Sequence, residues 1–431
     1  MNSKVIIDEL MKGNENTAFE MSRKALLLAY DREKKDIIYV EPRMTGGSGH
    51  FERLAVCYTS LLEKYGYSVE VVGAYQARST LPSNWKSAIP IPDHCLSSGK
   101  IVSEVQSLAF RNYWKRTTDY ILACSEQTPR LALFPTSRYL TIAGTLHAIE
   151  DLRDVKGGIF GVMETFPAPD CDNPEIVKSE FSHAASIVAQ SSKSYIFLAE
   201  SPQIRKFLIQ CGFDHGSVTV HPYPASSRFS GRNLPHQTTE RVRIGCIGGS
   251  RSVQNPGILA RYFTEYQQFS NVQWITKLNL DLACTQSGLN KDEILCGLKS
   301  NGVQNISQRL DDVTYDEIMT SLDIMIMPYA DRYRTIGSGI FLECISAGVI
   351  PLVPMESTMR RLYEDLGGLA PAIQDISPNG IHQSITEALD SISSLRGNAI
   401  CVQENWLNHE NGALAWEKLI TGFATTVLKG D

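Results

Sequence analysis

The chain lacks the cysteine patterns that mark metal and redox sites. Its ten cysteines are scattered over 431 residues, and no two of them are separated by only two residues. Zinc ribbons and thioredoxin-like CxxC motifs are thereby excluded. Cysteines within apolar runs, such as Cys246 and Cys344, indicate buried thiols in a reducing compartment. We therefore expect no zinc site.

Long apolar segments and a strong charge are also missing. The first twenty residues have no apolar core of the kind found in signal peptides. No run reaches the roughly 18 apolar residues that a membrane-spanning helix needs. The net charge of −6 argues against broad nucleic-acid binding but leaves room for a local basic pocket. We expect a cytoplasmic protein, with peripheral membrane contact and a partner subunit left open.

What the sequence does contain is an alternation of short apolar runs and amphipathic segments. Asp36–Val40 is a predicted strand, Glu52–Tyr65 has helical periodicity, and Ser68–Val72 is again a predicted strand. Strands separated by helices predict a parallel sheet that helices cover on both faces. Other segments are interpreted as strands at Tyr120–Cys124, Tyr139–Ala143 and Ser186–Gln190, and as a helix start at Ser194–Glu200.

The pattern occurs twice, which fits a length above the roughly 250–300 residues of a single core. The Pro- and Ser-rich segment His221–Thr239 has the composition of an interdomain linker. After it, the predicted strand Val242–Ile247 again leads into a glycine turn, Gly248–Ser250. We therefore predict an α/β fold with two Rossmann-like, doubly wound domains that face a cleft, with boundaries at 1–230 and 231–405, followed by a closing helix, 406–431.

The first glycine turn is a candidate binding loop. Gly46, Gly47 and Gly49 follow the first strand, and His50 precedes the next helix. Glycines let a ligand approach the backbone, and the start of a helix offers unpaired N–H groups to a phosphate or sugar oxygen. A tight connection without a ligand explains the same residues, because a single glycine-rich turn is a weak signal.

The most informative stretch runs from Met327 to Pro354. Gly337-Ser338-Gly339 opens a predicted helix that carries Glu343, whose neighbours Phe341, Leu342, Cys344 and Ile345 are apolar. Glycines at a helix start expose backbone amides to phosphate, and a carboxylate one turn later can accept hydrogen bonds from two ribose hydroxyls. A surface position for Glu343 is the alternative, but the apolar neighbours indicate a buried carboxylate that needs a partner.

This stretch resembles the signature of retaining GT-B glycosyltransferases of the large family 4. Glu343, Ala347, Gly348 and Pro351 match the second half of that signature. Other segments resemble family landmarks in the same order, and these are GGSGHFERLA, IVAQSSKSYIFLAE, VTVHPYPASSRF, RIGCIGGSR and DEIMTSLDIMIMPY. The resemblance implies an acceptor-binding first domain, a nucleotide-sugar-binding second domain and a last helix that returns to the first domain.

The resemblance assigns the donor site, with two departures from the family. The first glutamate of the signature, eight positions before Glu343, is replaced by Thr335. Arg251 can stand for the diphosphate-binding arginine, but the usual lysine is missing, and either Lys277 or Arg332 and Arg334 can supply the charge. The predicted donor-binding residues are Gly249, Arg251, Lys277, Arg334, Gly337, Ser338, Gly339 and Glu343.

On the acceptor side, the segment Thr141–Leu152 resembles the family's strand followed by a loop histidine. By this resemblance His147 lies near the transferred sugar, and Glu150 can orient an acceptor hydroxyl or act as a base. We therefore predict His147 and Glu150 as catalytic and Gly46, Gly47, Gly49 and His50 as acceptor-binding. A loop histidine that only caps the next segment is the alternative for His147.

Together these features predict a glycosyltransferase, with a retaining and metal-independent mechanism. It would move a sugar from a nucleotide-sugar donor, of UDP or GDP type, to a glycan, lipid-linked or protein acceptor, and it would need no cofactor. Two alternatives are a nucleotide-sugar epimerase of the same architecture and a non-catalytic protein that binds sugar nucleotides or glycans. Thr335 in place of the usual glutamate favours the second of these.

Overall fold

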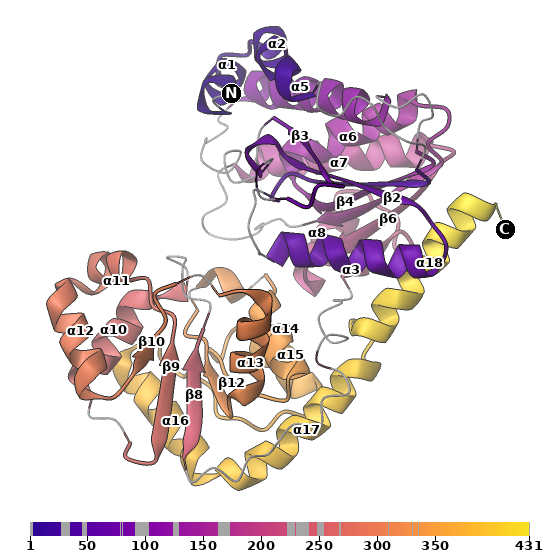
Figure 1. Cartoon of the computed structure of the whole chain (residues 1–431). Helices are drawn as coiled ribbons and strands as arrows, with labels where there is room; N and C mark the ends of the chain where they lie inside the picture. The colour runs from indigo at the N-terminus through magenta and orange to yellow at the C-terminus, as the bar shows by residue number, and fades with distance from the viewer. Residues whose placement is uncertain are drawn as a thin grey trace. The chain divides into compact units, whose positions relative to one another are not determined.

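A computed structural model divides the chain into two compact units (Figure 1). The first comprises Met1–Pro222 and Trp416–Asp431, and the second Tyr223–Ala415. The structure describes residues 3–26, 35–44, 50–77, 79, 81–90, 103–123, 129–162, 173–221, 229, 241–247, 254–266, 269–308, 310–329, 331–334 and 336–430. The division thus falls at residues 222 and 415, whereas the sequence analysis placed it at 230 and 405.

In its described residues, the first unit is built on a seven-stranded parallel sheet with the strand order β3-β2-β1-β4-β5-β6-β7. The strands are β1 Ile37–Glu41, β2 Val69–Ala74, β3 Lys86–Ile89, β4 Leu131–Ser137, β5 Gly157–Val162, β6 Ser194–Ala199 and β7 Val218–Val220. The helices are α1 Ser3–Met11, α2 Glu15–Leu26, α3 His50–Lys64, α5 Glu104–Ala123, α6 Tyr139–Asp151, α7 Pro174–Gln190, α8 Pro202–Gln210 and α18 Ala413–Lys429, with the 3-10 turn η2 at Tyr75–Ala77.

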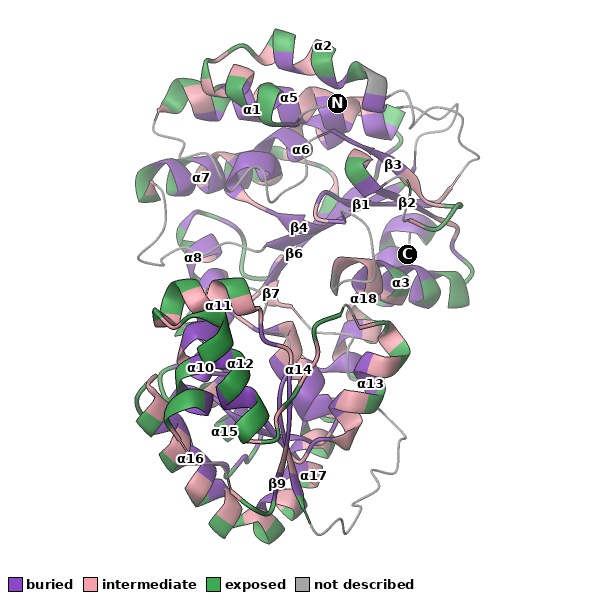
Figure 2. Cartoon of the chain, turned by 60° about the vertical axis from the view of Figure 1, so that its left-hand side comes forward, coloured by how far each residue is buried: buried purple, intermediate pink, exposed green. Residues whose placement is uncertain are grey.

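Both faces of this sheet are buried, and alternate residues of each strand enter different cores. In β1, Ile38 and Val40 belong to one core, and Ile37 and Tyr39 belong to the other. This follows from the two-residue side-chain period of a strand. Helices α1, α2, α5, α6, α7 and α8 contribute to the first core, while α3 and α18 contribute to the second. Figure 2 shows the strands of this sheet as mostly buried.

In the part of the second unit that the structure describes, the strands form a five-stranded parallel sheet with the order β10-β9-β8-β11-β12. The strands are β8 Val242–Cys246, β9 Val272–Thr276, β10 Gln304–Asn305, β11 Ile324–Ile326 and β12 Ile350–Leu352. The helices are α10 Pro256–Glu265, α11 Leu280–Ser287, α12 Lys291–Ser300, α13 Asp312–Ser321, α14 Gly339–Ser346, α15 Thr358–Asp365, α16 Pro378–Asp390 and α17 Ile392–Asn408, with the 3-10 turn η4 at Asp331–Arg334.

The prediction of an α/β fold with two parallel sheets is confirmed, but several local assignments were wrong. Tyr120–Cys124 and Tyr139–Ala143, expected as strands, fall at the end of α5 and the start of α6, apart from Cys124, which lies outside the described residues. Ser194–Glu200, expected as a helix, forms β6. A short apolar run fits a buried strand and a turn of a buried helix equally well, so periodicity cannot separate them.

No helix in the described ranges is long and apolar enough to cross a membrane.

The packing of α18 generates the first prediction. Trp416 is 5% exposed, and its ring meets that of Tyr58 edge-on with centroids 5.2 Å apart. Replacing it with alanine (Trp416→Ala) should lower the free energy of unfolding by about 3–5 kcal/mol, because it leaves a cavity between α18 and α3. Denaturation followed by circular dichroism measures the change.

Leu414, two residues earlier on the same helix, is 49% exposed and serves as the control. Leu414→Ala should change the free energy of unfolding by no more than about 0.5 kcal/mol. An equal loss in both variants would contradict the packing of α18 through Trp416.

Candidate functional site

The strand order of the second unit locates its candidate site. From β8 the chain proceeds outward to β9 and β10, and then returns to the other side of β8 for β11 and β12. In doubly wound sheets, ligands bind outside the carboxyl ends of the strands where the order reverses. That place is between β8 and β11, so the segments that follow these two strands form the centre of the candidate site.

Helix α14 follows β11 and carries the predicted donor residues at its start. Its N-cap is Ser338, whose Oγ accepts a hydrogen bond of 3.3 Å from the backbone N–H of Phe341. Gly337 precedes the cap and Gly339 is the first helical residue. The helix therefore presents backbone N–H groups and the positive end of its dipole at the carboxyl edge of the sheet.

Glu343 lies within α14 and is 3% exposed, as its apolar neighbours predicted. The hydroxyl of Tyr315, on α13, donates a hydrogen bond of 2.6 Å to Glu343 Oε2. A buried carboxylate without such a partner would cost several kcal/mol of stability. The Tyr315 hydroxyl therefore holds a carboxylate in place one turn from the helix start.

Two side chains of the segment after β8 form hydrogen bonds with the segment after β11. Asn255 has a left-handed backbone with φ of 50°, and its Nδ2 donates a 2.7 Å hydrogen bond to the carbonyl of Pro328. The Nε2 of the buried Gln254 donates to the hydroxyl of Tyr329 over 3.3 Å. These bonds connect the two sides of the switch point directly.

Lys277 lies at the carboxyl end of β9, where its backbone N–H donates to the carbonyl of Cys246 over 2.9 Å. Together with Asn279, Lys291 and Asn305 it lines a cavity of about 280 Å³ beside the ends of β9 and β10. Lys277 therefore lies at the carboxyl edge of the sheet, and its predicted role in donor binding stays a prediction.

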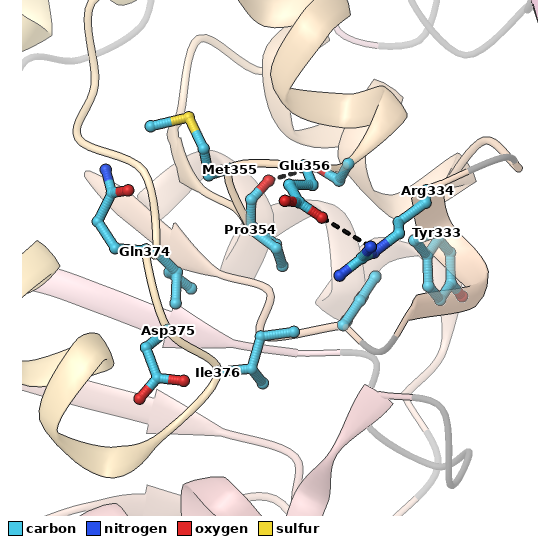
Figure 3. A pocket seen from close by; sticks show the side chains of 11 residues that line it. Tyr333, Arg334, Pro354, Met355, Glu356, Gln374, Asp375 and Ile376 are labelled. Carbon is cyan, nitrogen blue, oxygen red and sulfur yellow. Dashed lines mark hydrogen bonds and ion pairs between the residues drawn. The ribbon is translucent and has the colours of Figure 1, made fainter.

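Arg334 belongs to η4, which follows β11. Its side chain is 56% exposed and forms an ion pair of 2.7 Å with Glu356, which follows β12 (Figure 3). Both residues line a second cavity, of about 400 Å³, together with Tyr333 and Asp375. Arg334 and Lys277 thus lie beside different cavities on either side of the switch point.

Several predicted residues lie outside the described residues, namely Gly46, Gly47, Gly49, Gly249, Arg251 and Thr335. His50 is the first residue of α3, and its side chain is likewise outside the description. The binding roles predicted for these residues stay predictions.

The first unit contains a buried carboxylate that the sequence analysis missed. Its strand order reverses between β1 and β4, and Glu41 is the last residue of β1. Glu41 is fully buried, and its Oε1 accepts hydrogen bonds from the backbone N–H of Arg43 at 2.8 Å and from Thr136 Oγ1 at 2.5 Å. A glutamate that ends an apolar strand just before a glycine turn was the available signal.

His147 was expected in a loop that follows a strand. It lies instead within the helix α6, Tyr139–Asp151. Its Nε2 lies 3.0 Å from Nε2 of His183 on α7. Burial lowers the pKa of both imidazoles, and the positive charge of Arg111 on α5 lowers them further. His147 therefore forms part of the contact between helices on one face of the sheet.

Glu150 lies near the end of α6 and contacts the start of β6. Its Oε1 accepts a 2.6 Å hydrogen bond from Ser191 Oγ and a second one from the hydroxyl of Tyr195. In a parallel sheet, the start of a strand is at the edge opposite the carboxyl ends. Glu150 was expected in a loop that follows a strand, but it lies near the end of the helix α6, at the edge opposite the carboxyl ends, and its hydrogen bonds join α6 to β6.

Comparison with known proteins gives matches in structure but none in sequence. No protein-family model matches the chain, and no curated protein matches its sequence. A glycosyltransferase from Rickettsia africae ESF-5 superposes with a TM-score of 0.62 at 11% identity, over 93% of this chain and all of that one. Sucrose-phosphate synthase from Thermosynechococcus elongatus gives 0.60 at 11% identity, over 92% and 100%. HepE from Anabaena, with UDP and glucose, gives 0.55 at 11% identity, over 90% and 99%.

The chain has the GT-B fold. Both of its sheets are parallel and doubly wound, and the structural matches extend over nearly the whole of each chain. Identities near 11% establish the architecture alone, because one fold supports many activities. Any activity of this GT-B chain must therefore be argued from its own residues.

Asn255 generates the second prediction. Asn255→Ala should destabilise the chain by about 1 kcal/mol for the lost hydrogen bond to Pro328 and by about 1–2 kcal/mol more for a left-handed alanine. Asn255→Gly loses only the bond, because glycine adopts a positive φ without strain. Urea unfolding of the two variants measures the difference, and a glycine variant no more stable than the alanine variant would contradict the strain.

The His147–His183 pair generates a prediction about pH. Since folding lowers the pKa of both imidazoles, the folded chain binds protons less readily than the unfolded chain. The resulting stability is present above the unfolded pKa of about 6.5 and is lost as the pH falls below it. The melting temperature should therefore drop between pH 7.5 and 5.5.

His183→Gln should reduce this drop by about 1–3 °C, a small effect because both rings are only partly buried. The exposed His215, changed to glutamine, is the control and should leave the drop unchanged. The charged groups that act on the pair are Arg111, Lys115 and Asp119 on α5 and Asp151 on α6. An unaltered drop in His183→Gln would contradict the coupling of the two rings.

Proposed function

We propose that the protein is a glycosyltransferase whose second unit binds the nucleoside diphosphate of a nucleotide-sugar donor. The observation that carries the proposal is the buried carboxylate of Glu343, held by Tyr315 one turn from the start of α14 at the switch point. The helix start suits the diphosphate, and the carboxylate suits the hydroxyls of the ribose.

The diphosphate has cationic neighbours on one side of the switch point in this proposal. Lys277 at the end of β9 and the predicted Arg251 in the segment after β8 supply positive charge on the β8–β9 side. Positive groups that face the leaving diphosphate stabilise the charge that develops on it in the transition state. The residues of the second unit thereby bind the donor and promote departure of the nucleotide.

The acceptor belongs to the first unit in this proposal, at the segment from Gly46 to His50 that follows β1. Glu41 supports this placement, because it is buried at the switch point of that sheet and accepts a hydrogen bond from the backbone N–H of Arg43. His147 and Glu150 carry no part of the proposal, since their contacts lie between α6, α7 and β6.

UDP is the first nucleotide to test, since HepE from Anabaena, which shares the fold, was solved with UDP and glucose. A retaining reaction is proposed from the signature around Glu343. Metal independence is also proposed, although the sequence contains Asp170 and Asp172, two carboxylates separated by one residue, which lie outside the described residues. A chelator therefore belongs in the experiment.

The test is a thermal-shift panel with UDP, GDP, ADP and CMP, each with and without EDTA. One nucleotide at 100 times its dissociation constant should stabilise the chain by about 2.7 kcal/mol through mass action. Glu343→Gln should remove most of this shift, while Glu265→Gln, at a position whose side chain is 48% exposed in the same unit, should keep it. A shift that EDTA abolishes would contradict metal independence.

Incubation of the stabilising nucleotide's sugar forms with a glycan panel then separates the alternatives. Release of nucleotide with a new glycoside supports transfer. A changed sugar configuration without acceptor identifies an epimerase, and binding without either reaction identifies a non-catalytic protein. Absence of any nucleotide-induced shift in the wild-type chain would overturn the donor site itself.

A further inference from the structure

The proposed donor site leaves the cavity beside Arg334 without an occupant. Its volume of about 400 Å³ falls in the range of about 300–1,000 Å³ that is usual for small-molecule sites. We propose that this cavity takes the glycosyl group of the donor and selects a neutral sugar over an acidic one. The inference rests on the proposed function and specifies its substrate class.

The position of the cavity fits this role. Its walls follow β11 and β12 and include Ile373, which pairs with Pro354 beyond β12. The cavity beside Lys277 lies at the ends of β9 and β10, so three strand spacings of about 4.8 Å, or about 14 Å, separate the two. This separation matches the length of an extended nucleotide sugar, with its diphosphate between them at the start of α14.

The inner wall offers flat and apolar surfaces. The rings of Tyr329 and Tyr333 are both buried and pack with centroids 4.6 Å apart. Ile373 and Pro354 are likewise buried and line the same cavity. The C–H faces of a pyranose pack well against aromatic and aliphatic surfaces, because such contacts remove apolar area from water.

The rim offers hydrogen-bond acceptors for hydroxyl groups. Figure 3 shows Arg334 and Glu356 joined by their ion pair, and Gln374 and Asp375 on another segment of the rim. Carboxylates accept hydrogen bonds from hydroxyl groups, and such bonds are stronger than those between neutral groups. The rim is thus suited to a ligand that carries several hydroxyl groups.

The charge of the rim gives the selectivity. Among the lining residues that the structure describes, one is positive, Arg334, and two are negative, Glu356 and Asp375. Glu356 already neutralises Arg334 at 2.7 Å, so the carboxylate of a uronic acid would meet a net negative surface and would have to break an existing ion pair. A neutral hexose or N-acetylhexosamine meets neither obstacle.

Calorimetric titration of the full chain tests the proposal. With UDP as the nucleotide, the probes are UDP, UDP-glucose, UDP-galactose, UDP-N-acetylglucosamine and UDP-glucuronate. At least one neutral sugar form should bind about tenfold tighter than UDP, as one or two hydrogen bonds to charged groups would give. UDP-glucuronate should bind no tighter than UDP.

The variants Asp375→Asn and Glu356→Gln remove one negative charge each from exposed positions. Each variant should reduce the affinity that the neutral sugar adds over UDP by at least about threefold. The double variant should bind UDP-glucuronate more tightly than the wild type does. Both should leave the affinity for UDP within about twofold of wild type, which also shows that the variants fold. Glu265→Gln is the matched control and should change none of these affinities.

Two failures can be told apart in this design. If UDP and the other nucleotides do not bind the wild-type chain, the proposed function fails and the sugar cavity fails with it. If UDP binds but no neutral sugar adds affinity, or if the variants leave that gain unchanged, the cavity is overturned while the donor site stands. Tighter binding of UDP-glucuronate than of UDP by the wild type would overturn the selectivity.

Discussion

The constraint on which the candidate site depends is the way a parallel sheet is connected. Every strand must be followed by a crossover that returns to the opposite edge, and right-handed crossovers place helices on both faces. In a doubly wound sheet, the chain first adds strands on one side of its first strand and later adds strands on the other side. Where this order reverses, the segments that follow the two neighbouring strands lead away from each other. In the second unit those strands are β8 and β11, and in the first unit they are β1 and β4.

Each of the two switch points has a buried carboxylate, and different hydrogen-bond donors stabilise the two. Glu343 receives a side-chain hydroxyl from Tyr315, whereas Glu41 receives a backbone N–H and the hydroxyl of Thr136. Hydrogen bonds to a charged group are worth about 1.5–3 kcal/mol each, and a missing partner leaves the full cost of desolvation. Each pair therefore fixes the segment beside it as well as the carboxylate.

The sequence was sufficient for features that depend on residues close together along the chain. The burial of Glu343 followed from its apolar neighbours, and Lys277 was placed correctly because it directly follows a strand of clear periodicity. The position of Glu150 was wrong because Tyr139–Ala143 is apolar in a way that fits a strand or a buried helix. Whether such a run forms a strand depends on its neighbours in space, and here α5 and α7 pack against it.

Features that depend on distant segments could not be predicted. The bond from Asn255 to the carbonyl of Pro328 joins residues 73 positions apart, and the ion pair of Arg334 depends on Glu356 after the next strand. The Nε2 atoms of His147 and His183 meet only because α6 and α7 are neighbours. In each case the residue type is visible in the sequence, but its partner is decided by the strand order.

The charges along the carboxyl edge of the second unit also give a direction to any ligand that spans it. Among the described residues that line the cavity beside β9 and β10, Lys277 and Lys291 are positive and Asp281 is negative. The described residues that line the cavity beside β12 include one cation, Arg334, and two carboxylates, Glu356 and Asp375. A diphosphate is stabilised near cations and destabilised near carboxylates, and both effects grow as water is excluded. A nucleotide sugar would therefore place its anionic part toward Lys277 and its uncharged ring toward Asp375, and the reverse orientation would set the diphosphate against two carboxylates.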